Sequence, residues 1–210
     1  AGDPRLPMLS PDGDRLAYLK GTNPANLFVV DAGGGSPIQV GGGIPGTEDG
    51  REIFGWWPGG DALGFISMSS GARRIFLADP ATGASAALPA DTGDVESFRW
   101  SPDGEQIVYA GKESGETEIR TLRADGSGEA RTLYHGNAHG VVSLDWTPSG
   151  RIQFCSEQEG ACHFILPAGF FTIQEVLLNP GGNELHAVAV DDAGNGSAPS
   201  AAISLHRPAA

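Results

Sequence analysis

The chain has 210 residues, with 26 acidic side chains against 13 Lys and Arg and a formal net charge of −13. Nucleic-acid surfaces need clustered basic residues, so this charge argues against such a partner, and no apolar run is long enough to cross a membrane. The 32 Gly and 15 Pro, with no stretch of 3.6-residue apolar periodicity, argue against long helices and predict one all-β domain.

The first 40 residues predict four short strands. A turn at Ser10–Gly13 separates an apolar run at 6–9 from a second run at 16–19, and further strands are expected at 26–31 and 36–40. Proline sets the φ that the second position of the turn requires, and glycine takes the left-handed conformation at no steric cost. The segment therefore begins as a β-hairpin and continues as a four-stranded unit.

The same turn recurs along the chain between apolar runs. Its prolines are 47, 44, 46 and 32 residues apart; they are Pro11, Pro58, Pro102, Pro148 and Pro180. The first three intervals match a propeller blade of about 40–45 residues. We therefore expect a β-propeller of about five blades, roughly 1–46, 47–92, 93–138, 139–173 and 174–210, in which the fourth is shortened and the fifth lacks its outer strand.

Residues 10–31 and 98–125 carry the repeat most clearly: a Ser-Pro-Asp-Gly turn, an Ile/Leu-x-Tyr strand, and a third strand. This pattern resembles the WD-like propeller repeat of TolB-type proteins. The resemblance implies four-stranded blades around a central channel, often six or more, and a protein-binding role in the periplasm. Five copies leave open a five-bladed ring, a fragment, or a subunit of something larger.

Aromatic residues follow the turn in four copies, at Tyr18, Phe65, Tyr109 and Phe154, whereas the fifth copy has Ala187. Large aromatic side chains dominate core energetics, so we expect these positions, together with Trp100, to pack one blade on the next. A binding platform is the alternative.

The two cysteines, Cys155 and Cys162, flank a predicted hairpin tip. Directly opposed residues of antiparallel strands lie within disulfide reach, so a Cys155–Cys162 disulfide is one interpretation and two reduced thiols the other. A disulfide favours an oxidising compartment. Because residues 1–4 do not resemble a signal peptide, the chain is either cytosolic or a mature periplasmic or extracellular protein; we expect the latter.

Metal and catalytic motifs are weak. His135 and His139 are four apart but in a Gly-flanked loop, which disfavours a zinc site. Asp191, Asp192 and Asn195 are oxygen-rich calcium candidates, with a solvated hairpin loop as the alternative. The sequence contains no nucleophile-elbow or phosphate-loop motif. We expect no cofactor and no resident metal.

A candidate partner surface follows from topology. In a propeller, the linkers between blades and the loops joining second and third strands lie on one face. That face would carry mostly acidic side chains suited to a basic segment of a partner, with plain solvated loops as the alternative. The residues are Glu48, Asp49, Asp94, Glu96, His135, His139, Glu157 and Glu159, with Asp191 and Asp192 beside them.

Two functions are compatible with these observations. The first is a non-catalytic propeller that acts as a protein-interaction module or accessory subunit of an extracytoplasmic complex. The second is an enzyme, or the propeller domain of one, of the peptidase or polysaccharide lyase type with its site at the channel mouth; this is analogy at the level of the fold.

Overall fold

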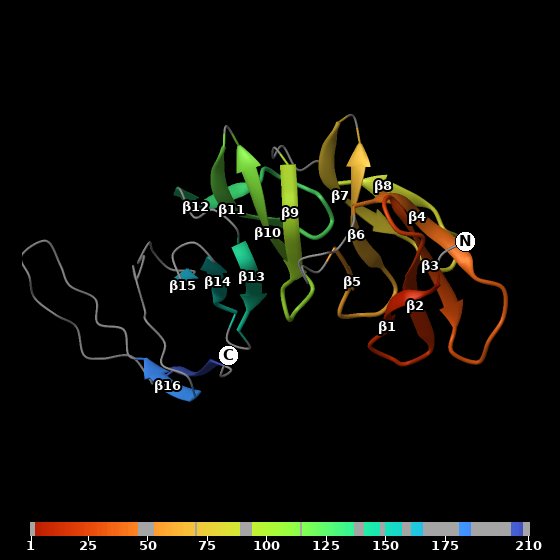
Figure 1. Cartoon of the computed structure of the whole chain (residues 1–210), viewed down its shortest axis with the longest axis horizontal. Helices are drawn as coiled ribbons and strands as arrows, with labels where there is room; N and C mark the ends of the chain where they lie inside the picture. Colours follow the sequence, from red (N-terminus) through yellow and green to blue (C-terminus); the bar gives the residue numbers. More distant parts are fainter. Residues whose placement is uncertain are drawn as a thin grey trace, which may run out of the picture.

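The computed structural model describes residues 3–45, 53–69, 71–88, 94–113, 115–136, 141–147, 150–156, 161–165, 181–185 and 203–207, and all regular structure in these segments is β-strand. The strands form five separate antiparallel sheets. Three of them are complete four-stranded blades that lie side by side (Figure 1). The all-β prediction and the four-stranded repeat are thus confirmed, whereas a count of five blades stays a prediction.

Each of the first three sheets keeps its strands in chain order. Blade 1 contains β1 (Arg5–Leu9), β2 (Arg15–Lys20), β3 (Ala25–Asp31) and β4 (Ile38–Ile44). Blade 2 contains β5 (Phe54–Trp56), β6 (Leu63–Ser69), β7 (Ala72–Ala78) and β8 (Ser85–Ala87). Blade 3 contains β9 (Asp94–Trp100), β10 (Gln106–Glu113), β11 (Glu116–Arg123) and β12 (Arg131–Gly136).

The later sheets are smaller in the described residues. One has three strands, β13 (Val141–Trp146), β14 (Ile152–Ser156) and β15 (Ala161–Ile165), and the other pairs β16 (Gly181–Leu185) with β17 (Ile203–Arg207). The predicted turn at 179–182 is wrong at its last two residues, because Gly181 and Gly182 pair with Arg207 and His206. The two glycines permit an extended strand as well as a turn, and here they take part in the pairing of β16 with β17.

Four of the predicted turns are confirmed by their closing hydrogen bonds. The fourth residue of each donates its N–H to the carbonyl of the first over 2.8–2.9 Å; these fourth residues are Gly13, Gly60, Gly104 and Gly150. All four have φ between 75° and 82°, where glycine is favoured. In blade 3 the turn is further held by Ser101 Oγ, which donates to Asp103 Oδ1 at 2.6 Å.

Tryptophans at the ends of the first strands join neighbouring blades. Each donates its Nε1–H to a backbone carbonyl of the preceding blade: Trp56 to Met8 over 3.1 Å, Trp100 to Gly55 over 3.1 Å, and Trp146 to Arg99 over 3.4 Å. The expected packing role of Trp100 is therefore confirmed. A repeated contact of this kind sets a constant offset between successive blades.

The hydrophobic core runs continuously through blades 1 to 3. A second cluster of buried residues joins blade 3 to the three-stranded sheet of β13, β14 and β15. Phe65, Tyr109 and Phe154, the predicted aromatic positions of the second strands, are fully buried, while Tyr18 of blade 1 is half-buried and stacks on Phe28. Burying one such side chain contributes about 1.5–3 kcal/mol. The expected packing between blades is thus confirmed at Phe65, Tyr109 and Phe154, whereas Tyr18 stacks on a residue of its own blade.

Candidate functional site

One end of blades 2 and 3 gathers the ionisable side chains that the sequence placed at strand connections. The strands β6 and β10 run towards this end, where their connections to β7 and β11 lie (Figure 1). Asp94 begins β9 and His135 is near the end of β12, so both belong to it. We call this the connection face.

Asp94 and Glu96 belong to an ion network between blades 2 and 3. Arg73 of β7 binds Asp94 twice, through Nη2 to Oδ2 at 2.6 Å and through its backbone N–H to Oδ1 at 2.9 Å. Glu96 Oε1 lies 2.9 Å from Lys112 Nζ and 3.9 Å from Arg73 Nη2. Two carboxylates and two cations therefore balance one another across the blade boundary.

Burial separates the roles of the two carboxylates. Glu96 is 4% exposed, so its buried charge needs the neighbouring cations of Lys112 and Arg73, and removing either cation would leave a buried charge poorly compensated. The side chain of Asp94 keeps about half its surface in solvent. Glu96 therefore lies beneath the surface that a partner would contact, whereas Asp94 lies at its edge.

The hydrogen bond from the Arg73 side chain lowers the pKa of Asp94 below its ordinary value, and burial opposes this only in part. The same hydrogen bond raises the pKa of Arg73. Both groups stay charged at neutral pH, so the network is a permanent feature of this end of the molecule.

His135 and Glu116 form the exposed part of the connection face. His135 Nε2 lies 2.5 Å from Glu116 Oε2, and the two side chains are 54% and 44% exposed. They come from the neighbouring strands β12 and β11, in which Glu118 is the register partner of His135. This pair presents an imidazole and a carboxylate to solvent at the end of blade 3.

The structure adds residues that the sequence did not single out. Arg73, Lys112 and Glu116 are the partners of the predicted Asp94, Glu96 and His135. Arg73 and Asp94 belong to different blades, so their pairing follows from blade stacking and has no local sequence pattern. Glu116 could have been predicted as a residue of this face from the sequence. It follows the short connection between the second and third strands of blade 3, and such connections were assigned to that face.

The other predicted residues are only partly described. Glu48, Asp49, His139, Glu157, Glu159, Asp191, Asp192 and Asn195 lie outside the described residues. Cys155 and Cys162 are direct register partners of β14 and β15, and Cys155 is disulfide-bonded. Within the described segments no group of three His, Cys, Asp or Glu side chains could hold a metal ion.

Repeated four-stranded antiparallel blades, stacked through tryptophans at the ends of their first strands, define a β-propeller. More particularly, the chain has a TolB-like β-propeller fold. It superposes on a putative TolB from Agrobacterium tumefaciens with a TM-score of 0.58 at 23% identity, covering 78% of this chain and 57% of that one.

Two further solved structures share the fold. TolB from Acinetobacter baumannii matches with a TM-score of 0.58 at 15% identity, over 91% of this chain and 50% of that one. A chain of a nidogen/laminin complex matches with a TM-score of 0.57 at 14% identity, and the match covers 74% of this chain and 57% of that one. This chain thus spans little more than half the length of the structures it matches.

No family model matches the sequence, and no curated protein does. In the part of the chain that the structure describes, we find no helix with the length and hydrophobicity needed to cross a bilayer.

Proposed function

We propose that this protein is a non-catalytic β-propeller that acts as a protein-interaction module, as an accessory subunit of an extracytoplasmic complex. Its partner contacts the connection face through exposed side chains that include Asp94, Glu116 and His135. The proposal also assigns a role in partner binding to the predicted loop residues Glu48, Asp49, His139, Glu157 and Glu159, which lie outside the described residues.

The observation that carries this proposal is the combination of rigidity and exposure at one sheet end. The Arg73–Asp94 pair ties blade 2 to blade 3, and the Lys112–Glu96 pair joins two strands of blade 3. His135 and Glu116 are exposed to solvent at the same end. A preorganised charged surface loses little side-chain freedom on binding. It also gives electrostatic specificity and a faster encounter with a complementary partner.

Two observations support the extracytoplasmic part of the proposal. Cys155 is disulfide-bonded, and disulfides persist mainly in oxidising compartments. The fold is that of TolB structures, and the match to a chain of the nidogen/laminin complex supports the interaction part of the proposal.

Affinity capture from native extract tests the proposal. We expect the wild-type chain to recover a stoichiometric partner, and the Glu116→Gln and His135→Gln variants to recover several-fold less. Glu129→Gln is the matched control, because Glu129 is exposed and lies between β11 and β12, at the opposite end of blade 3.

Three results would contradict the proposal. The first is that no stoichiometric partner is recovered. The second is that the three variants lose capture equally. The third is turnover of peptides or uronic oligosaccharides that is abolished by His135→Gln, because that result would make the chain an enzyme.

A further inference from the structure

At the end of blades 2 and 3 that lies away from the connection face, there is a cleft of about 410 Å³. This volume is within the range of ligand-binding pockets. The cleft lies between the turn before β6 and the turns that follow β9 and β11. We call it the Trp57 cleft. Its principal lining residues are Trp57, Asp61, Trp100, Glu105, Arg123 and Asp125.

The Trp57 turn departs from the repeat in two coupled positions. Trp57 stands where blades 1 and 3 have a buried serine, and Gly59 stands where they have the aspartate that this serine binds. A Cβ at Gly59 would lie 1.6 Å from Trp57 Cζ3, so the tryptophan ring requires glycine there. The pair of changes turns a purely structural turn into one that presents an indole.

The indole is held in position by the neighbouring blade. Trp57 Nε1 donates to the Gly104 carbonyl at 2.8 Å, and a Cβ at Gly104 would approach Nε1 to 2.6 Å. Trp100, which also lines the cleft, uses its own Nε1–H for the Gly55 carbonyl. Both rings are therefore fixed, and what they offer to a ligand is aromatic surface.

The polar groups of the cleft are mainly acceptors. Asp61, Glu105 and Asp125 supply three carboxylates against the single guanidinium of Arg123, which lies 3.9 Å from Asp125. The N–H groups of both tryptophans are already used, and the carboxylates outnumber the guanidinium of Arg123 three to one, so the cleft favours a ligand that brings donors and positive charge. The net charge of −13 attracts cations to this site and repels anions.

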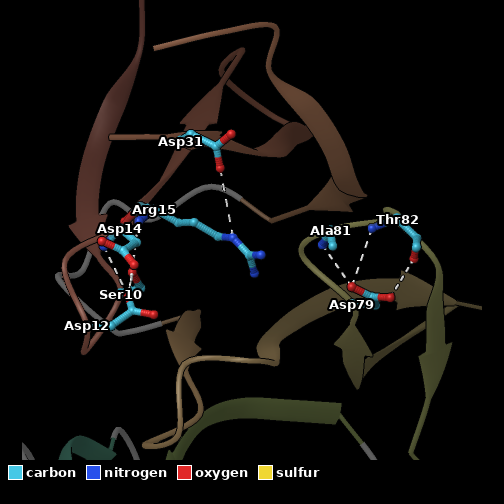
Figure 2. Close-up of polar contacts among 8 residues, drawn as sticks. All are labelled: Ser10, Asp12, Asp14, Arg15, Asp31, Asp79, Ala81 and Thr82. Atoms are coloured by element: carbon cyan, nitrogen blue, oxygen red, sulfur yellow. Dashed lines mark hydrogen bonds and ion pairs between the residues drawn. The ribbon is translucent and has the colours of Figure 1, made fainter. Parts of the chain in front are cut away.

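The equivalent groove between blades 1 and 2 shows which group fits. It is smaller, about 190 Å³, and Arg15 from the start of β2 lies in it, with Nε 4.0 Å from Asp31 Oδ1. The guanidinium points into the space between Asp31 and the turn that contains Asp79 (Figure 2). After the hydrogen bonds from Thr82 and Ala81, the charge of Arg15 also lowers the pKa of Asp79.

In the Trp57 cleft, the position equivalent to Arg15 is Ala62. The chain's own guanidinium is thus replaced by a methyl group, and the cleft is correspondingly larger. On the far wall, Asp125 stands where the first groove has Ala81, which adds an acceptor. Arg123 stands where the first groove has Asp79, so the acceptors of the Trp57 cleft are Asp61, Glu105 and Asp125, and the position of the chain's own guanidinium is left open.

We propose that the Trp57 cleft binds an arginine side chain of a basic segment in a protein partner. The guanidinium stacks on the indole surfaces of Trp57 and Trp100, and Asp61, Glu105 and Asp125 accept its hydrogen bonds. Arginine suits this geometry because its planar group both stacks on aromatic rings and forks towards carboxylates. This inference rests on the proposed function and names the chemistry of the partner at a second surface.

Calorimetric titration of the full chain tests it with two capped peptides, Gly-Gly-Arg-Gly-Gly and the same peptide with citrulline. Citrulline keeps the shape and planarity of arginine but is neutral. We expect the arginine peptide to bind at least about fivefold more tightly. Equal binding of the two peptides, or tighter binding of a neutral oligosaccharide, would overturn the proposal.

Two variants are chosen to fold. Trp57→Ser with Gly59→Asp installs the Ser-Pro-Asp-Gly turn of blades 1 and 3, and Ala62→Arg fills the cleft as Arg15 fills the first groove. Each should weaken arginine-peptide binding about fivefold or more. Unchanged binding in either variant would show that the peptide binds elsewhere and would overturn the proposal.

Asp61→Asn and Asp14→Asn form a matched pair, because the two residues hold the same repeat position and each change removes one charge. Only Asp61→Asn should weaken binding, by about threefold. An equal effect of both would reduce the interaction to general charge attraction and would overturn the site.

The proposed function has a separate readout. If the partner captured from native extract is recovered equally by wild type and Ala62→Arg, the interaction module stands and the arginine site is refuted. If Ala62→Arg and the arginine peptide both reduce capture, while the citrulline peptide does not, both proposals are supported.

Discussion

Gly64 gives the sharpest test of how the blades stack. It lies in β6 of blade 2, where side chains from the first strand of blade 3 pack against it. A Cβ at this position would lie 2.8 Å from Phe98 Cε2 and 3.0 Å from Trp100 Cζ2. Phe98 is fully buried and cannot turn away into solvent, so Gly64→Ala forces the two blades apart.

The expected magnitude combines two effects. Overpacking of a well-packed core costs about 1–3 kcal/mol, while replacing glycine by alanine in a compatible backbone recovers about 0.4–1 kcal/mol from the unfolded chain. The net loss in the free energy of unfolding is therefore about 1–2 kcal/mol. For a chain of this size that lowers Tm by about 2–8 °C.

Gly33→Ala is the matched control. A Cβ there meets nothing within 4 Å, and its backbone is not in the left-handed region. Urea denaturation and calorimetry of both variants should show a stability loss for Gly64→Ala alone. Adding Phe98→Leu makes room for the new methyl group, so the double variant should be less unstable than the sum of the single changes. Equal losses at Gly33 and Gly64, or strict additivity with Phe98→Leu, would refute this packing account.

Three further predictions concern the network, the disulfide and the tryptophan contacts. The pKa of Asp94 is lowered in the fold, so its stabilising contribution is present above about pH 4 and is lost as pH falls through the folded pKa; chemical denaturation should show the gap between wild type and Asp94→Asn closing from pH 6 to pH 3, and a widening gap would contradict this. Reduction of the predicted Cys155–Cys162 bridge should lower the free energy of unfolding by about 2–3 kcal/mol in the same assay, with no effect in a Cys155→Ser Cys162→Ser variant. Trp100→Phe removes a hydrogen bond to the neighbouring blade and should cost about 1–3 kcal/mol, with an unchanged Tm as the contrary result.

The fold was predictable because its signals are local and repeated. The Ser-Pro-Asp-Gly turn specifies a hairpin from four adjacent residues, and its spacing specifies a blade. The prediction failed at Gly181 and Gly182, which pair with Arg207 and His206, although the same Pro-Gly-Gly sequence closes a turn at Gly60. A Pro-Gly-Gly sequence alone permits a turn, but it does not exclude a strand.

The site was harder to predict because its contacts cross between blades. Asp94 and Glu96 were recognised as acidic residues of one face, but the burial of Glu96 depends on Lys112 and on Arg73 of another blade. Sequence periodicity says which residues share a repeat position. It does not say which residues of two repeats meet, since that depends on the offset between blades.

Departures from a repeat are informative when two of them are physically coupled. A lone Trp57 in place of serine could be drift in a tolerant turn, but the ring fits only because Gly59 has replaced the aspartate. Likewise, Ala62 vacates a position that Arg15 fills in blade 1, and Asp125 adds a carboxylate at the same cleft. Changes that would each weaken the structural role of the repeat combine here into one aromatic, acidic cleft. That combination is the reason to look for function at Trp57 and not at the regular turns of blades 1 and 3.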